Sequence, residues 1–235
     1  MIAKAFLLKA NLPTLLEAVS RQMEVIAPLA TPAGPVYATW QGEQGETLDL
    51  RALPLSPPTE FLLAHKEVLF RYVQESGRYT FKEEDADPRL LFAIRPCDLH
   101  AITVLDRIFA QPPGDQAYFR RRRATALVVS NCTSPAEECN CLGLQAGPQA
   151  VDPCDLQITD LGEGFLCEAE TPAGILILNA GASLLQPARP DHLQEKERLI
   201  SQARAALPPD RSADSMREAM KQADWEALGR ECLGC

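Results

Sequence analysis

Cysteines are the residues of this chain most able to do chemistry, and the sequence contains eight of them. Four occur in two short segments, RPCD at positions 95–98 and NCTSPAEECNC at positions 131–141. Four cysteine thiolates are the usual ligand set of a [4Fe-4S] cluster or of a structural zinc ion. The candidate ligands of one metal centre are therefore Cys97, Cys132, Cys139 and Cys141.

Each cysteine segment follows an apolar run, at positions 90–94 and 126–130, which is typical of a strand buried on both faces. Apolar residues at helical spacing over 99–109 predict a helix between them, preceded by a tight RPCD loop in which Asp98 caps the helix. Strand, helix and strand form a βαβ unit, so the strands should be parallel neighbours. Ligands collect at the carboxyl edge of such a sheet. We therefore expect Cys97 and Cys132 to lie close together.

The segment 131–141 has neither a helical nor a strand period, so we expect a loop that folds back to present three thiols. Zinc sites usually contain C-x2–4-C pairs, whereas the only close pair here is Cys139-Asn-Cys141. This irregular spacing favours an iron–sulfur cluster, with a structural zinc site or unrelated thiols as alternatives. Cys232 and Cys235 form a C-x2-C pair and are candidate further ligands. Cys154 is expected in a loop and Cys167 in the core.

The remaining pattern indicates a mixed α/β fold, in which a small parallel βαβ core carries the cysteine loops. We expect strands at 2–8, 25–29 and 35–40, and a helix from Thr59. Segments 155–161, 164–170 and 174–179 are predicted to form an added antiparallel strand set, and C-terminal helices should begin near 191 and span 214–228. Residues 1–188 would form the metal-binding domain and 189–235 a helical arm.

Composition excludes several functions. The net charge is -9, with 32 acidic and 23 basic residues, which argues against nucleic acid as a partner. The one basic block, at 120–123, is either a solvated helix face or a docking patch for an acidic partner. The chain has neither an apolar stretch of about 20 residues nor a secretory signal. We expect it in the cytoplasm, where cysteines serve metal or redox chemistry rather than disulfides. It also lacks a recognisable nucleotide-binding motif.

The segments LLFAIRPCDLHAITVLDRIF (90–109) and CTSPAEECNC (132–141) resemble the iron–sulfur (beta) subunits of cytoplasmic sulfhydrogenases, and are similar also to the corresponding subunit of anaerobic sulfite reductase. Trp225 and ECLGC (231–235) look like the lead-in to that family's two-cluster ferredoxin domain, most of which this sequence lacks. The chain is therefore expected to be a fragment or a short version.

The resemblance implies a hetero-oligomer in which a [4Fe-4S] subunit relays electrons. It would stand between a flavin/NAD(P)-binding subunit and a hydrogenase-like or sulfite-reductase catalytic subunit, with no substrate chemistry of its own. Two other classes of function remain open. One is a zinc-stabilised structural or assembly subunit, and the other is an enzyme that reduces a sulfur compound at an open iron site.

Overall fold

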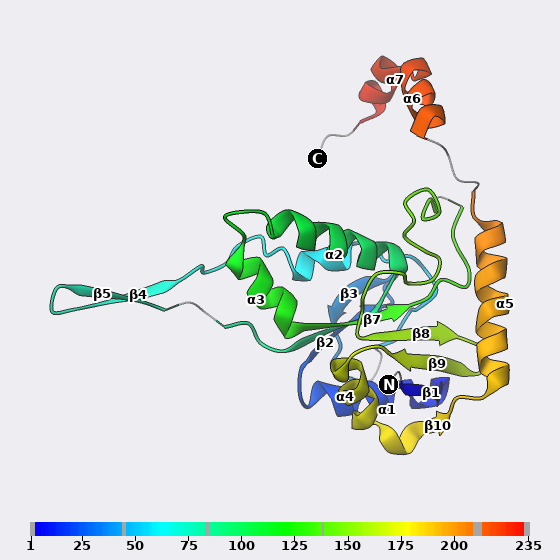
Figure 1. Ribbon diagram of the computed structural model, residues 1–235, viewed down its shortest axis with the longest axis horizontal. Helices are drawn as coiled ribbons and strands as arrows, with labels where there is room; N and C mark the ends of the chain where they lie inside the picture. Colours follow the sequence, from blue (N-terminus) through cyan, green and yellow to red (C-terminus); the bar gives the residue numbers. More distant parts are fainter. Residues whose placement is uncertain (1–2, 44–45, 83–84, 138, 209–212, 233–235) are drawn as a thin grey trace.

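The computed structural model describes residues 3–43, 46–82, 85–137, 139–208 and 213–232. Its centre is an eight-stranded sheet with the order β10-β1-β9-β8-β7-β6-β2-β3 (Figure 1). The strands of this sheet are β1 (Ala3–Leu8), β2 (Glu24–Leu29), β3 (Val36–Thr39), β6 (Arg89–Ile94), β7 (Thr125–Ser130), β8 (Leu156–Asp160), β9 (Gly164–Ala169) and β10 (Leu185–Pro187). A separate hairpin consists of β4 (Arg71–Glu75) and β5 (Arg78–Lys82).

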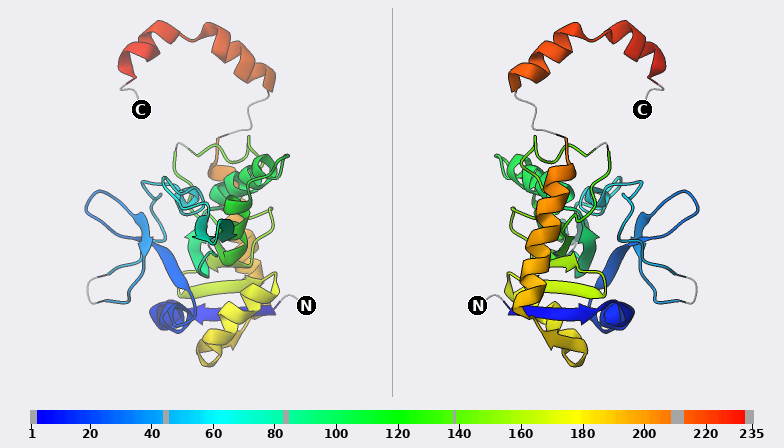
Figure 2. Two further views of the ribbon diagram at one scale, coloured as in Figure 1. Left: turned by 90° about the vertical axis from the view of Figure 1, so that its left-hand side faces the viewer. Right: turned by 90° about the vertical axis from the view of Figure 1, so that its right-hand side faces the viewer.

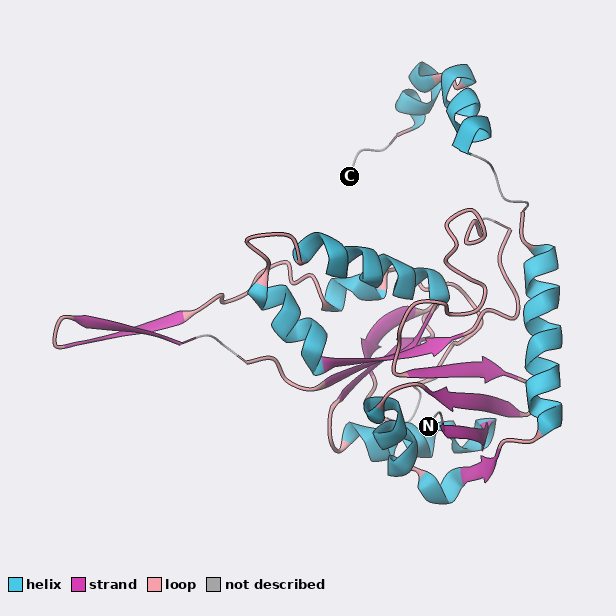
Figure 3. Ribbon diagram, viewed as in Figure 1, coloured by secondary structure: helices cyan, strands magenta, loops and turns pink. Residues whose placement is uncertain are grey.

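Helices cover both faces of the sheet (Figure 3). The helices are α1 (Leu12–Ser20), α2 (Pro96–Phe109), α3 (Gln116–Ala124), α4 (Pro172–Ala180), α5 (Pro190–Ala206), α6 (Ala213–Gln222) and α7 (Trp225–Glu231), with short 3-10 turns at Lys9–Asn11, Pro58–Phe61 and Ala182–Leu184. One core cluster joins α1 and α4 to the sheet, and a second joins α2 and α3 to the opposite face. The predicted mixed α/β class is confirmed.

The parallel core is the part that the sequence predicted best. Strands β2, β6, β7 and β8 run parallel, and α2 and α3 form the crossover from β6 to β7. The side chains of β6 and β7 alternate between the two core clusters, as with Leu90 and Leu91, which are both fully buried. Burial on both faces explains why these strands read as continuous apolar runs.

The antiparallel strands extend this same sheet. β8 pairs antiparallel with β9, which pairs with β1, and β1 pairs with β10. The expected strand at 174–179 is wrong, because this segment lies in α4. Thr171 accepts a hydrogen bond from the Gly174 N–H at 3.3 Å and Pro172 occupies the first turn, two features that start a helix. A short apolar run fits a buried helix as well as a strand.

The helix expected from Thr59 is also wrong. Only Pro58–Phe61 forms a 3-10 turn, and the chain then continues into the β4–β5 hairpin, which projects from the body (Figure 1). The hairpin is exposed along both strands. Tyr72 lies opposite Phe81, and the two rings belong to a row of aromatic side chains on one face. The apolar spacing that indicated a helix face belongs instead to an exposed strand.

The C-terminal helices differ in how they contact the body. α5 runs beside β8 and β9, and the Lys196 ammonium pairs with Glu168 of β9. The single helix expected over 214–228 is two helices, α6 and α7, which stand apart from the sheet (Figure 2). Met216 and Met220 of α6 are exposed. None of the helices in the described part of the chain is both long and apolar enough to cross a membrane.

Candidate metal centre

Cys97 lies in the first turn of α2, at the carboxyl end of β6. The helix begins at Pro96 with Arg95 as its N-cap, so the expected tight loop is part of the helix instead. Asp98 acts from the third helical position, where its Oδ2 accepts the Arg95 N–H at 3.2 Å. The helix therefore holds Cys97, which is exposed, on a rigid element.

A β-bulge precedes this turn. The register between β6 and β7 shifts between Leu91 and Ile94, and Ala93 has a positive φ of 57°. The Tyr37 hydroxyl donates a hydrogen bond to the Ala93 carbonyl at 3.4 Å in the buried core. A bulge bends its strand and re-aims the residues that follow it. Here it directs the end of β6 into the turn that carries Cys97.

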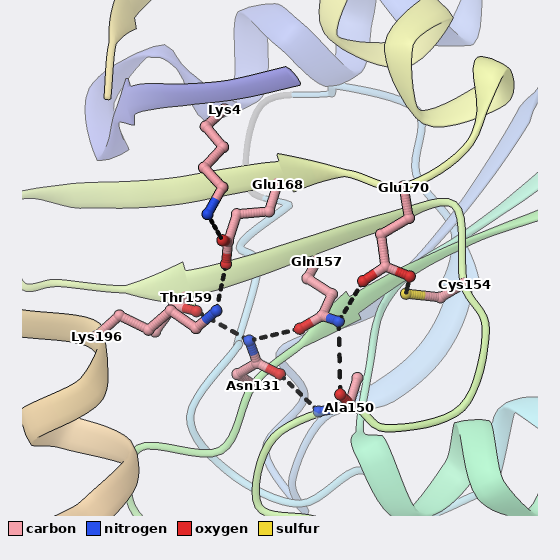
Figure 4. Close-up of polar contacts among 9 residues, drawn as sticks. All are labelled: Lys4, Asn131, Ala150, Cys154, Gln157, Thr159, Glu168, Glu170 and Lys196. Carbon is pink, nitrogen blue, oxygen red and sulfur yellow. Dashed lines mark hydrogen bonds and ion pairs between the residues drawn. The ribbon is translucent and has the colours of Figure 1, made fainter. Parts of the chain in front are cut away.

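Cys132 directly follows β7 and begins a loop whose two ends are joined. Its N–H donates to the Pro148 carbonyl at 2.9 Å, and the Asn131 N–H donates to the Ile158 carbonyl at 2.9 Å. The Asn131 side chain accepts the Ala150 N–H, also at 2.9 Å (Figure 4). These bonds fix where the loop leaves the sheet and where it returns.

The loop folds back onto the start of α2. A Cβ added at Gly147 would lie 3.3 Å from the Cys141 sulfur and 3.4 Å from the Pro96 Cβ. Gly147 therefore stands between Cys141 and the residue before Cys97, and its missing side chain allows their approach. Within the loop, the Ala146 N–H donates to the Cys141 carbonyl at 2.8 Å.

The thiols influence one another's protonation. Desolvation of its sulfur, followed by the negative charges of Asp98 and Cys132, raises the pKa of Cys97 to about 12. Burial raises the pKa of Cys132, with Cys141 and Cys139 adding to the shift. Burial and the Cys139 charge raise the pKa of Cys141. Cys97 and Cys132 thus interact electrostatically with other thiols of the set, and Cys141 interacts with Cys139.

The thiols are nevertheless not gathered around one point. Among the described residues, no set of three or more His, Cys, Asp or Glu side chains is placed to hold a single metal ion. Cys132, Cys139 and Cys141 are each partly buried. Cys232 is exposed beyond α7, and Cys235 lies outside the described residues.

Arg95 is a residue of this region that sequence reasoning missed. Its guanidinium is buried and donates to the carbonyls of Leu50, Arg51 and Ala52 at 2.9, 2.9 and 3.0 Å. Its second terminal nitrogen lies 3.9 Å from the Cys132 sulfur, within hydrogen-bond range for sulfur. The sequence did contain a signal, because Arg95 directly follows a wholly apolar strand. A charged side chain at such a position must either find buried hydrogen-bond partners or reach the solvent.

Other histidine and cysteine side chains outside the four candidate ligands have structural partners. His100 Nδ1 lies 2.7 Å from Asp152 Oδ2, which gives this histidine a partner outside the cysteine set. Cys167 is buried, as expected, and Cys154 is a loop thiol that is also buried. Its sulfur lies 3.8 Å from a Glu170 carboxylate oxygen.

The basic block at 120–123 lies in α3 and is partly internal. Arg121 donates to the Leu62 carbonyl at 2.9 Å and pairs with Glu67. Arg122 pairs with Asp106 at 3.2 Å. Both side chains are mostly covered. These two arginines are therefore part of neither a solvated helix face nor a docking patch.

Comparison with known proteins gives one informative match. No family model matches the chain. The chain is 25% identical over 213 residues to the sulfhydrogenase 2 subunit beta of Pyrococcus furiosus, covering 86% of this chain. It spans 62% of the length of that relative. The similarity to anaerobic sulfite reductase stays a prediction. The match confirms the resemblance that the cysteine motifs indicated, because this chain is distantly similar in sequence to a sulfhydrogenase beta subunit over most of its length.

Proposed function

We propose that this chain is an electron-transfer subunit of an oxidoreductase. Its centre would be a [4Fe-4S] cluster with Cys97, Cys132, Cys139 and Cys141 as ligands. The observation that carries the proposal is the convergence of two cysteine segments at one sheet edge. Cys97 follows β6 and Cys132 follows β7, its parallel neighbour. The relative is itself a sulfhydrogenase subunit.

The chemistry of the donor set fits such a cluster. The four cysteines are free thiols, and the charges of neighbouring thiols contribute to the raised pKa values of Cys97, Cys132 and Cys141. A single zinc ion needs all its sulfurs about 2.3 Å from one point, whereas a cluster distributes its ligands over several metal atoms. The irregular spacing of the four cysteines, among which Cys139-Asn-Cys141 is the only close pair, favours a cluster over zinc. When bound, the cluster would supply one-electron oxidation and reduction.

The protein would contribute position and electrostatics. Helix α2 orients Cys97 from a rigid first turn, and the joined loop ends orient Cys132. The covered sulfurs limit the access of water, while the exposed Cys97 leaves one side of the site at the surface. Electrons would enter or leave through that side, because transfer requires a short path to a partner.

The partners follow from the same resemblance. We propose a hetero-oligomer with a flavin/NAD(P)-binding subunit on one side and a hydrogenase-like or sulfite-reducing subunit on the other, in the cytoplasm. Cys232 and Cys235 would join a second centre only with ligands from residues outside this sequence. A zinc-stabilised assembly subunit without redox function is the second candidate, since a tetrathiolate site also suits zinc.

Metal analysis tests this proposal. The chain, purified anaerobically or reconstituted with iron and sulfide, should contain about four iron and four sulfide per chain and absorb in the visible range. Stoichiometric zinc without iron after both treatments would support the second candidate instead.

Cysteine variants test the ligand assignment. Cys97→Ser should remove most of the iron, although Cys97 is remote in sequence from the loop. Cys167→Ser, a change in the core, is the matched control and should retain the iron. Equal iron contents in the two variants would contradict the ligand set.

A further inference from the structure

We propose that Arg95 is the buried counter-ion of this metal centre and that its charge sets how readily the centre accepts an electron. The inference rests on the proposed function, and it concerns a residue that is not itself a ligand. Arg95 would act through Cys132, as a positioning and tuning residue.

The first argument is the burial of the charge. Arg95 is 7% exposed, and an arginine remains protonated even when buried. A buried charge without an opposite charge is costly, so such groups are normally paired. The ion pairs within the described residues do not include Arg95. The Asp98 carboxylate accepts the backbone N–H of Arg95 and interacts electrostatically with the Arg95 charge, but it forms no ion pair with the guanidinium.

The second argument is the geometry of the guanidinium. One terminal nitrogen bonds the three carbonyls at positions 50–52, which fixes the side chain in place. The other terminal nitrogen points to the Cys132 sulfur at 3.9 Å. The sulfur within hydrogen-bond range of this second nitrogen is that of Cys132, which would be a thiolate on a metal centre. Four thiolates on such a centre would therefore add a counter-charge to that of Asp98.

The third argument is that Arg95 contacts three segments around the cysteines. The Arg95 backbone caps α2, whose first turn holds Cys97, while its side chain reaches the Cys132 loop and the 50–52 segment. No other described side chain hydrogen-bonds to one of the four candidate ligand sulfurs. Loss of this side chain would change both the charge at the sulfurs and the anchoring of the 50–52 segment.

The direction of the effect follows from electrostatics. Reduction adds a negative charge to the cluster, and a nearby cation stabilises the reduced form more than the oxidised form. Hydrogen bonds to cluster sulfurs and the local charge are known determinants of potential. Arg95 should therefore raise the reduction potential, and its neutral replacement should lower it.

Two substitutions separate charge from anchoring. Arg95→Gln removes the charge, whereas Arg95→Lys keeps the charge but loses the planar fork that bonds the carbonyls. If Arg95 tunes the centre, the Lys variant should stay close to the wild-type potential. If Arg95 is only a structural anchor, Gln and Lys should behave alike. Arg89→Gln is the matched control, because Arg89 lies at the far end of β6 and bonds Glu24 and the Phe61 carbonyl.

The experiment is a potentiometric titration of the reconstituted chain, followed by electron paramagnetic resonance. Arg95→Gln should lower the equilibrium constant for one-electron reduction by about tenfold, which is about 59 mV. Arg89→Gln should leave it unchanged. An unchanged potential in an iron-loaded Arg95→Gln variant overturns the inference, as does an equal shift in the Lys variant.

A different experimental result would show that the proposed electron-transfer function is wrong. A wild-type chain that binds zinc and no iron would overturn the electron-transfer function without removing the need for a counter-ion. In that case zinc affinity is the readout, and Arg95→Gln should weaken it about tenfold, with Arg95→Lys in between. Equal affinities would overturn the counter-ion role.

Discussion

The Asn131 side chain joins the two ends of the cysteine loop. Its Oδ1 accepts the Ala150 N–H at 2.9 Å, and its Nδ2 donates to Gln157 at 3.2 Å and to Thr159 at 3.0 Å (Figure 4). All these polar groups are buried, or nearly so. Because Asn131 directly precedes Cys132, this one amide couples the position of the loop to strand β8.

Replacing this amide should destabilise the protein strongly. Asn131→Ala leaves buried groups of Ala150, Gln157 and Thr159 without a partner, and each such group costs about 1–3 kcal/mol. We expect the free energy of unfolding, measured with urea, to fall by about 3 kcal/mol. Asn179→Ala, at an exposed position of α4, should change it by less than about 0.5 kcal/mol. A loss below about 1 kcal/mol in Asn131→Ala would show that the loop ends are held by other contacts.

The βαβ unit could be predicted from the sequence because its signals are local. Two wholly apolar runs flank a segment with helical spacing, and chain geometry then requires a parallel crossover. That topology places Cys97 and Cys132 after neighbouring parallel strands, as expected, whereas their shared metal site stays a prediction. The start of α2 was placed too late, because Pro96 suits a first helical turn as well as a loop.

The contacts that shape the site could not be predicted in the same way. Arg95 reaches carbonyls more than 40 positions away in sequence, and Asn131 reaches Ala150 and β8. No local pattern encodes such pairings. Helix α4 was missed for a related reason, because the glycine in its first turn is required by a contact distant in sequence. Gly174 packs so closely on Asp155 that an added Cβ would lie 1.9 Å from the Asp155 carbonyl oxygen. This contact favours glycine even though glycine has a low helix propensity.

Two arginines of the basic block in α3, Arg121 and Arg123, should contribute differently to the stability of the protein. Arg121 bonds the Leu62 carbonyl and Glu67 from a mostly covered position, whereas Arg123 is exposed. Arg121→Gln should lower the free energy of unfolding by about 1–3 kcal/mol, since it leaves buried groups unsatisfied. Arg123→Gln should stay within about 0.5 kcal/mol. Equal effects would show that α3 tolerates loss of charge anywhere along the block.

The β4–β5 hairpin should be the least stable ordered sheet of the molecule. A two-stranded hairpin is marginal in water, and the rings of Tyr72, Tyr79 and Phe81 are more than half exposed. Backbone amides of β4 and β5 should therefore exchange with deuterium fast, while those of β6 and β7 should be protected up to global unfolding. Hydrogen exchange followed by mass spectrometry distinguishes the two sheets. Protection of the hairpin equal to that of β6 would mean that another contact covers it in solution.

The last prediction concerns acid stability and the buried Glu168. Burial alone would raise its pKa, but hydrogen bonds from Lys196 and Lys4 hold the pKa of Glu168 below its usual value (Figure 4). A carboxyl whose pKa is lowered by folding binds protons more readily in the unfolded chain. Its stabilisation is therefore complete above the ordinary glutamate pKa and is lost as the pH falls through the lower, folded value.

Urea unfolding between pH 3 and pH 7 measures this linkage. Glu168→Gln should flatten the acid limb of the stability curve. At pH 7 it should cost about 3 kcal/mol, because it leaves the Lys196 ammonium buried without its main partner. Glu195→Gln is the control, since Glu195 pairs with Arg198 at the surface, where solvent and salt screen the interaction, and the acid limb should stay steep. An acid limb that stays equally steep in Glu168→Gln would assign the acid sensitivity to other carboxylates.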